Sequence, residues 1–314
     1  MSEQAYHLPV LLQPTIDALA IRPDGVYIDG TAGGGGHSFA IASRLTTGHL
    51  YSLDRDPDAI AEASARLAGL PATVVQTNFT GMDKVLQERG IPGVDGILLD
   101  IGVSSHQLDT AERGFSFHMD APLDMRMSQS GPTAADLVNT ADERELARIL
   151  WEYGEEKFSR QIARNIVAAR KDKPITTTFE LSDIIAASVP AAVRRAGPPA
   201  RKSFQAIRIA VNGELDCLSE ALDTAFRCLN EGGRLAIITF HSLEDRIVKQ
   251  RFAAWRQGCT CPPEFPVCVC GRTPAAENAI RKPITATPEE EAANPRSRSA
   301  KLRCIIKRHE PYDI

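Results

Sequence analysis

Hydrophobic and polar positions alternate regularly along the first third of the chain. Short apolar runs stand at Val26 to Ile28, Leu50 to Leu53, Thr73 to Val75 and Ile97 to Ile101. Each run is followed by a turn or by a segment long enough for a helix. This rhythm favours a parallel β-sheet with helices on both faces, so we expect an open α/β fold.

The pattern changes after Ile101, because helical periodicity then dominates for about 100 residues without a convincing strand. Two capping boxes indicate helix starts within this stretch, Thr140 with Glu143 and Thr177 with Glu180. We therefore expect an all-helical domain at residues 105–204, inserted into an α/β domain made of residues 1–104 and 205–314.

The sheet is expected to resume after the insertion. A Pro and Gly cluster at Ala196 to Ala200 breaks the chain. A long amphipathic helix then follows, which Gly232 and Gly233 end before a buried strand at Leu235 to Phe240. Its apolar stripe contains Phe204, Ile207, Val211, Leu215, Leu218 and Leu222. The remaining pattern predicts a helix from Leu243 to about Trp255, a loop rich in Cys and Pro, and a last strand near Leu302 to Ile306.

Composition and charge restrict the function classes. The length of 314 residues allows a large core, and 43% hydrophobic with 24% charged residues excludes wholesale disorder. The net charge of −4 provides no general basic field, so contacts to nucleic acid must come from local patches. Candidate patches are Arg201 with Lys202, Lys249 with Arg251, and Arg296 with Arg298.

The segment Met1 to Leu12 lacks the basic and apolar regions of a secretory signal, and no run of about 18 apolar residues occurs. We expect a cytoplasmic protein that does not enter a membrane.

A glycine run marks the first candidate site. The apolar run from Val26 leads directly into Gly33, Gly34, Gly35 and Gly36, which open a helix. Glycines allow a tight turn and let the backbone approach a ligand at the carboxyl end of the strand. Asp54 ends the next apolar run, where a carboxylate accepts both ribose hydroxyls of a bound nucleoside. Together these features predict an adenosine-containing cofactor, against the alternative of a turn without a ligand.

The spacing of the glycines favours S-adenosyl-L-methionine over a nicotinamide dinucleotide. Ser38 stands where the third glycine of the dinucleotide fingerprint would be. Asp29, directly before the turn, suits the amino group of a methionine moiety and would repel a pyrophosphate. A nicotinamide-dependent oxidoreductase remains the enzymatic alternative.

Two further residues follow predicted strands. Phe79 lies just past the third apolar run, where its ring would cover an adenine or belong to the core. Asp100 closes the fourth apolar run, and a carboxylate in that position is rarely there for packing.

Around these residues the sequence closely resembles the bacterial ribosomal RNA small-subunit methyltransferase H family, also called MraW. The resemblance spans almost the whole chain and rests on eight motifs in order. They are His7-Leu-Pro-Val-Leu11, Asp29-Gly-Thr-Ala-Gly-Gly-Gly-Gly-His-Ser38, Asp54-Arg-Asp-Pro57, Asp100-Ile-Gly-Val-Ser-Ser105, Arg113-Gly-Phe-Ser-Phe117, Pro122-Leu-Asp-Met-Arg-Met127, Phe240-His-Ser-Leu-Glu-Asp-Arg246 and Asn294-Pro-Arg-Ser-Arg-Ser299.

The resemblance implies a Rossmann-like class I methyltransferase sheet with a helical, substrate-recognising insertion. It also implies that the protein uses S-adenosylmethionine to methylate the N4 amine of cytosine 1402 in the decoding region of 16S rRNA, within the small ribosomal subunit. The cofactor contacts that it carries over are Gly35, Gly36, His37, Asp54, Phe79, Asp100 and Gln107.

Methyl transfer needs a well-placed amine and a proton acceptor. We expect Asp100 to act there together with the segment that includes Ser104 and Ser105. The Asp/Asn-Pro-Pro-aromatic motif of many amino-methyltransferases is missing, which keeps a non-catalytic RNA-binding or nucleotide-binding protein as a third hypothesis. In a methyltransferase without that aromatic, Phe115 or Phe117 would clamp the extruded cytosine, or else these rings would staple their own loop.

Two polar groups have open roles in substrate binding. Arg126 would pair with Asp124 or meet RNA. His241 would line the substrate pocket, or it would belong to a helix start in which Ser242 is the cap and Glu244 and Asp245 occupy the first turn.

Four of the seven cysteines form two C-x-C pairs, Cys259 with Cys261 and Cys268 with Cys270. Four thiolates suffice for a structural zinc ion, although C-x-x-C is the usual spacing. The alternatives are free thiols in a loop and, less favoured, a catalytic cysteine. The sequence leaves the oligomeric state open, a homodimer included.

Overall fold

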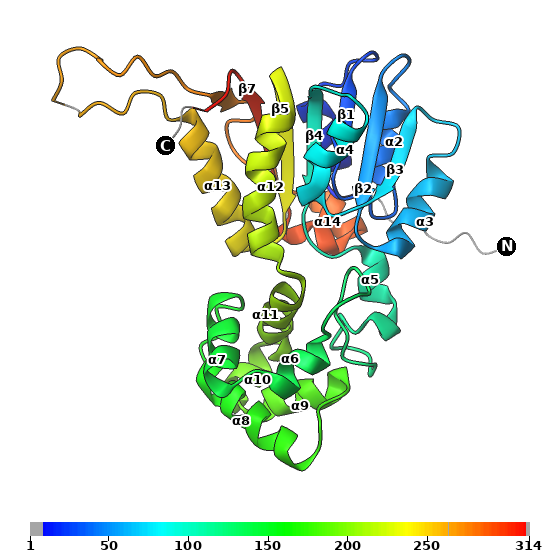
Figure 1. Cartoon of the computed structure of the whole chain (residues 1–314). Coiled ribbons are helices and arrows are strands. Elements are labelled where there is room, and N and C mark those ends of the chain that lie inside the picture. Colours follow the sequence, from blue (N-terminus) through cyan, green and yellow to red (C-terminus); the bar gives the residue numbers. More distant parts are fainter. Residues whose placement is uncertain (1–8, 263, 312–314) are drawn as a thin grey trace. The chain divides into compact units, whose positions relative to one another are not determined.

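The computed structural model describes residues 9–262 and 264–311, and it divides into two compact units (Figure 1). The first unit combines the chain up to Gly102 with the chain from Leu215, and the second runs from Val103 to Glu214. The expected insertion ended at residue 204, which is too early. Helix α11 (Ala200–Asn212) belongs to the second unit because Phe204, Ala206 and Ile207 lie in its core.

The first unit contains a seven-stranded sheet in the order β3-β2-β1-β4-β5-β7-β6. The strands are β1 (Val26–Asp29), β2 (His49–Asp54), β3 (Ala72–Gln76), β4 (Val94–Asp100), β5 (Leu229–Thr239), β6 (Ala276–Asn278) and β7 (Lys301–Lys307). The expected α/β class is confirmed, and the strands lie near the expected positions, except that β5 begins at Leu229 and not at the expected Leu235. The expectation of a parallel sheet holds only for β1 to β5, because β7 pairs antiparallel with β5 and with the unanticipated short strand β6.

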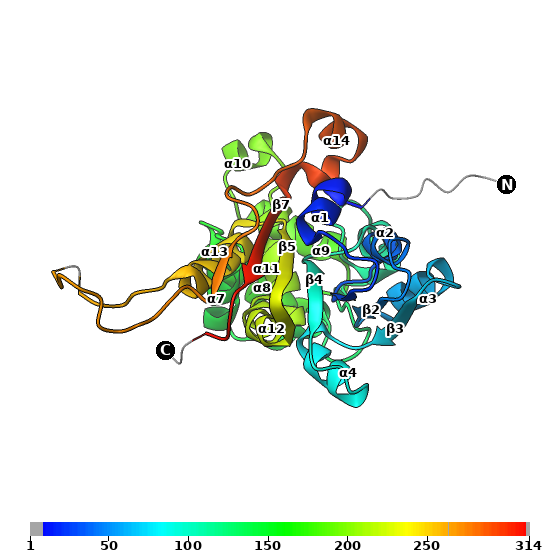
Figure 2. The same cartoon turned by 90° about the horizontal axis from the view of Figure 1, so that it is seen from above.

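Helices cover both faces of this sheet. Strand residues alternate between the two faces, so Ile28 and Leu99 pack towards α4, α12 and α13, whereas Tyr27 and Leu98 pack towards α1 and α2. Figure 2 shows α1 and α12 on opposite sides of β5. The helices of this unit are α1 (Leu12–Leu19), α2 (Gly36–Ala42), α3 (Pro57–Arg66), α4 (Met82–Glu88), α12 (Glu214–Cys228), α13 (Ser242–Arg256) and α14 (Pro288–Ala293), with short 3-10 turns η1 (Phe79–Gly81) and η3 (Pro295–Ser299).

The long amphipathic helix expected after residue 200 is two helices. Gly213 adopts a left-handed φ of 59° and ends α11, and α12 starts at the next residue. Helix α12 ends at Cys228, so Gly232 and Gly233 lie inside β5 and do not end the helix. The pairing of β5 with β4 shifts register near this point, and Gly232 supplies the positive φ of 79° at the irregularity.

The second unit is helical, as expected. Its helices are α5 (Ser105–Asp109), α6 (Ala134–Thr140), α7 (Glu143–Glu152), α8 (Ser159–Asp172), α9 (Thr178–Ala187), α10 (Ala191–Ala196) and α11, with the 3-10 turn η2 (Ala111–Arg113). Its residues form no extended strand, only an isolated bridge between Pro122 and Thr177. In the described ranges 9–262 and 264–311, no helix combines the length and apolar character that crossing a membrane requires.

One of the two expected capping boxes is present. Thr177 and Glu180 cap α9 reciprocally. The pairing of Thr140 with Glu143 is wrong, because Thr140 is the last residue of α6 and its hydroxyl donates back to Asp136 O at 2.7 Å. Asp142 caps α7 instead, accepting from Glu145 N at 2.8 Å.

Candidate active site

Three aspartates close three neighbouring strands at one edge of the sheet. Asp29 ends β1, Asp54 ends β2 and Asp100 ends β4, and β1 lies between the other two strands. Because these strands are parallel, their carboxyl ends share the edge where open α/β sheets bind ligands. The sheet therefore gathers carboxylates that are far apart in the sequence.

Asp29 is fully buried and held by its own loop. Its carboxylate accepts from Ser38 Oγ at 2.6 Å and from Thr31 N at 3.1 Å. Burial raises the pKa of Asp29 to about 6, against the opposing effect of the Ser38 and Thr31 hydrogen bonds. Ser38 stands where a dinucleotide fingerprint would have its third glycine, and its hydroxyl provides the shortest hydrogen bond to Asp29.

The glycine turn is tied to Asp54. Gly33 donates its N–H to Asp54 Oδ2 at 2.9 Å, and Gly33 and Gly35 have positive φ angles of 49° and 75°. A Cβ atom on Gly36 would lie 2.3 Å from Pro9 Cγ, so the glycine admits close packing of the segment before α1. A Cβ atom on Gly34 would meet the Glu62 carboxylate at 3.1 Å. Of the first sequence motif, His7 and Leu8 lie outside the described residues.

Phe79 begins η1, shortly after the end of β3. A Cβ atom on Gly30 would come within 3.0 Å of Phe79 Cβ, which places the phenylalanine next to the end of β1. Its ring is half-buried and packs partly against the sheet core. The core role considered from the sequence therefore holds for part of the ring.

Asp100 lies next to the buried His37 and keeps 23% of its own side chain exposed. His37 Nδ1 lies 3.5 Å from Asp100 Oδ2, while Nε2 lies 3.1 Å from Val10 O. Because a carbonyl oxygen only accepts, Nε2 must carry the ring proton, and Nδ1 then turns its lone pair towards Asp100. Burial lowers the pKa of His37 to about 4, so the imidazole is neutral near pH 7.

The second oxygen of Asp100 is the distinctive atom of this site. Oδ1 is buried and has no hydrogen-bond partner among residues 9–262 and 264–311. Burial, followed by the charges of Asp29 and Glu244, holds the pKa of Asp100 well above its usual range. A buried carboxyl oxygen without a partner is costly unless a ligand supplies one.

Thr31 links Asp29 and Asp100, and it was not among the site residues expected from the sequence. Its hydroxyl accepts from Asp100 N at 2.7 Å and lies 3.4 Å from Asp29 Oδ1, to which it donates. The only sequence signal for Thr31 and Ser38 is their place inside the glycine motif.

Ser104, Ser105 and Gln107 belong to the second unit, where they begin α5. Ser104 Oγ accepts from Gln107 N at 3.2 Å, and Gln107 Oε1 accepts from Ser104 N at 3.0 Å. Ser105 is the first helical residue. These contacts form a capping box, and the expected roles in catalysis and cofactor binding stay predictions.

The aromatic candidates for base stacking pack within the helical unit. Phe115 is buried in its core, and the guanidinium of Arg113 lies 5.9 Å from the ring centroid. Phe117 is half-buried and meets the ring of Phe204 edge-on, with centroids 5.5 Å apart. Both rings thus serve the packing role that the sequence analysis considered, and a contact with substrate stays a prediction.

Arg126 is engaged by Asp124 through two hydrogen bonds, from Nε at 2.9 Å and from Nη2 at 2.6 Å. The pKa of Asp124 is lowered by these hydrogen bonds to Arg126, although burial opposes them. The structural pairing is therefore present, and a contact of Arg126 with RNA stays a prediction.

His241 directly precedes α13 and is its N-cap, so the expectation that Ser242 would be the cap is wrong. Imidazole Nδ1 accepts from Glu244 N at 3.5 Å, and Nε2 lies 2.9 Å from the buried Glu244 Oε1. Asp245 in the same turn pairs with Arg303 at 2.7 Å. Arg296 and Arg298 lie in η3, where Arg298 is exposed.

The raised pKa of Asp29 predicts that the folded protein becomes less stable as the pH rises. Its pKa increases from 3.8 to about 6 on folding, so between these values the folded protein keeps a proton that the unfolded chain releases. The free energy of unfolding should fall by about 3 kcal/mol across this window. We expect urea unfolding to show this loss relative to Asp29→Asn between pH 4 and pH 7.

Asp24→Asn is the matched control for this measurement, because Asp24 is 71% exposed. Its pH profile should run parallel to that of the wild type. A difference between wild type and Asp29→Asn that stays constant over the pH range would contradict the assignment.

The comparisons with known proteins agree with one another. The model of the MraW methylase family matches residues 4–308. The ribosomal RNA small subunit methyltransferase H of Symbiobacterium thermophilum is 56% identical over 307 residues, which cover 96% of this chain and 96% of that protein. The protein of the same name from Lachnospira eligens is 57% identical over 302 residues, covering 95% and 96% of the two chains.

Among solved structures, an rRNA methylase from Streptococcus thermophilus is similar with a TM-score of 0.42 and 10% identity, over 94% of this chain and 95% of that one. That similarity is too weak to support an argument. The family model and the two relatives match this chain over almost its full length. This chain therefore belongs to the MraW methylase family.

Proposed function

We propose that this protein transfers a methyl group from S-adenosylmethionine to the N4 amine of cytosine 1402 in the decoding region of 16S rRNA. The observation that carries the proposal is sequence identity: more than half of the aligned residues are identical to those of proteins named ribosomal RNA small subunit methyltransferase H. This similarity supports S-adenosylmethionine-dependent methyl transfer to small-subunit rRNA. The choice of the cytosine amine rests on the resemblance of the eight sequence motifs.

The residues at the sheet edge fit S-adenosylmethionine. Asp54 is fixed by the Gly33 amide and retains lone pairs for ribose hydroxyls. Phe79, beside Gly30, suits the face of an adenine. Asp29 is buried and Asp100 half-buried, and after burial itself the charge of Asp29 raises the pKa of Asp100, so a cationic ligand would relieve this repulsion.

The same electrostatics disfavour the nicotinamide alternative. The pyrophosphate of a dinucleotide is anionic and would add to the repulsion between the carboxyl groups of Asp29 and Asp100 at this edge. Calorimetry with S-adenosylhomocysteine, NADH and ATP separates the cases, because tight binding of NADH alone would overturn the cofactor assignment.

We assign to Asp100 the role of binding the reacting amine and accepting its proton. When bound, S-adenosylmethionine supplies an activated methyl group. Asp100 Oδ1, buried and without a partner among the described residues, would accept one N–H of the cytosine amine and orient its nitrogen. A raised pKa also suits this carboxyl to receive the proton that the amine must lose, and Nδ1 of the neutral His37 lies next to it.

We assign RNA recognition to the helical unit. Four exposed basic residues follow one another along α10 and α11: Arg194, Arg195, Arg201 and Lys202. Such a cluster suits contacts to backbone phosphates, which position RNA without reading its sequence. Arg251, in contrast, pairs with Asp223 in the first unit, which makes it a weaker candidate.

The deciding experiment supplies labelled S-adenosylmethionine with three substrates made without modifications: a 16S rRNA transcript, small subunits reconstituted from it, and tRNA transcripts. We expect label on one cytosine of the 16S rRNA, carried on N4, when the product is mapped by mass spectrometry. Label only on tRNA or protein would refute the substrate. Label on another atom of the rRNA base would retain methyl transfer and refute the N4 assignment.

A further inference from the structure

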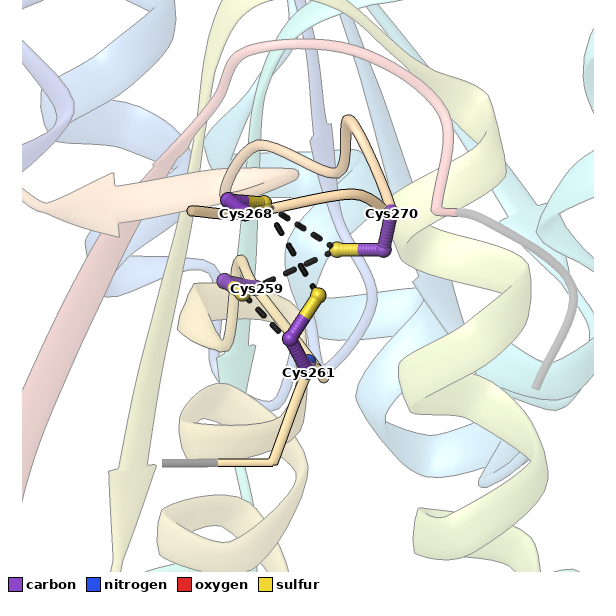
Figure 3. A group of neighbouring side chains, drawn as sticks. All are labelled: Cys259, Cys261, Cys268 and Cys270. Carbon is purple, nitrogen blue, oxygen red and sulfur yellow. Dashed lines mark hydrogen bonds between the residues drawn. The ribbon is translucent and has the colours of Figure 1, made fainter. Parts of the chain in front are cut away.

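Four cysteines gather in the segment between α13 and β6, apart from the carboxylates of the sheet edge. Figures 1 and 2 show this segment extending away from the sheet. Cys259 and Cys261 come from one arm of the loop, and Cys268 and Cys270 come from the other. Figure 3 shows their sulfur atoms turned towards a common centre.

The spacing of the sulfur atoms matches a tetrahedral metal site. The Sγ atoms are 4.0 Å apart for Cys261 and Cys268, 3.5 Å for Cys268 and Cys270, and 3.7 Å for Cys270 and Cys259. A zinc–sulfur bond of about 2.3 Å gives a tetrahedron with edges of about 3.8 Å. Each of these separations is far longer than the roughly 2.05 Å of a disulfide bond.

Backbone amides support the sulfur atoms as metal ligands. Cys261 N donates to Cys259 Sγ at 3.4 Å, and Val269 N donates to Cys261 Sγ at 3.4 Å. Amide donors favour the thiolate form, which is the form that binds metal ions. The second of these bonds also crosses between the two arms, so the loop backbone itself brings the two C-x-C pairs together.

The loop has little apolar burial of its own to hold this arrangement. Its large apolar side chains are exposed, with Phe265 at 50%, Val267 at 70% and Val269 at 74%. A short segment that lacks a core usually needs a cross-link or a metal ion to keep one conformation. The four facing thiols provide ligands for such an ion.

We propose that Cys259, Cys261, Cys268 and Cys270 form a structural zinc site. All four tetrahedral positions are filled by protein sulfur, which leaves no open position for a substrate and excludes a catalytic role. Soft thiolate ligands select zinc over magnesium or calcium. The ion joins the two arms of the loop and fixes Phe265 and Val267 between them at its exposed end.

The test measures metal in the full-length protein, purified with a reductant and without chelators. We expect about one zinc per chain by mass spectrometry of the metal content. Replacement by cobalt should produce the absorption bands of a tetrahedral cobalt–thiolate centre. Cys261→Ser with Cys268→Ser should lose both signals, whereas Cys217→Ser, a half-buried cysteine on α12, should retain them.

Hydrogen exchange provides a readout that does not depend on the variants. Removal of the ion with a chelator under reducing conditions should speed amide exchange in residues 258–271 and leave β4 unchanged. Less than about 0.1 zinc per chain after incubation with equimolar zinc and desalting would overturn the proposal. Two disulfides, unchanged exchange after chelation, or equal metal content in the double variant would also overturn it.

Discussion

Replacing Asp100 with asparagine will lower the rate of methyl transfer by about two to four orders of magnitude, the usual contribution of a positioned proton acceptor. The asparagine keeps the shape of the side chain but cannot take up a proton. It also removes a carboxylate whose charge is disfavoured by partial burial and by the charges of Asp29 and Glu244, so the protein should stay folded. The expected phenotype is a loss of kcat without a loss of stability.

The measurement is the initial rate with labelled S-adenosylmethionine at saturating concentration, together with thermal unfolding of the same preparation. Glu88→Gln is the matched control, because Glu88 is 74% exposed at the end of α4 and its removal should leave the rate unchanged. Near-normal turnover of Asp100→Asn would remove Asp100 from the role proposed for it. A variant that unfolds early would show that Asp100 serves the structure.

Replacing Asp54 with alanine will weaken binding of S-adenosylhomocysteine by about 100-fold, which corresponds to about 3 kcal/mol. The ribose hydroxyls would lose charge-assisted hydrogen bonds to the carboxylate. The Gly33 amide, which donates to Asp54 at 2.9 Å, would also lose its acceptor and no longer be held in the turn. Both effects act on cofactor binding and neither acts on RNA.

Calorimetry of the folded variant measures this effect directly. Asp24→Asn changes an exposed aspartate that precedes β1, whereas the glycine turn follows the other end of that strand, so this variant should bind as the wild type does. An unchanged affinity in Asp54→Ala would contradict the ribose contact. Equal losses for Asp54→Ala and Asp24→Asn would point to a general effect of charge on binding.

Local sequence patterns predicted the elements that short windows can encode. The five strands β1, β2, β3, β4 and β7 appear where apolar runs were found, and the helix after His241 starts and ends within one residue of its predicted range. The break at residues 196–200 separates α10 from α11, because Gly and Pro act on the backbone locally. Asp29, Asp54 and Asp100 were identified as strand ends because each directly follows a short apolar run.

Predictions of helix and strand boundaries were wrong where two local signals compete. Thr140 and Asp142 are both good caps, and only the end of α6 decides between them. The helical stripe continues across Gly213, so periodicity alone cannot show that α11 and α12 are separate helices. The antiparallel β7 looks in sequence like any other buried strand, because strand direction depends on the chain path outside it.

The α/β class, the glycine turn, the carboxylates at the strand ends and the family were predictable from the amino-acid sequence, since each depends on residue type and spacing within short motifs. The pairing of these groups with one another could be seen only in the folded chain. Thr31 meets Asp100 across 69 positions of sequence, and Phe115 is buried in a helical core. Whether the Asp100 oxygen has a partner depends on every element packed around it, because burial and long-range hydrogen bonds are properties of the folded chain.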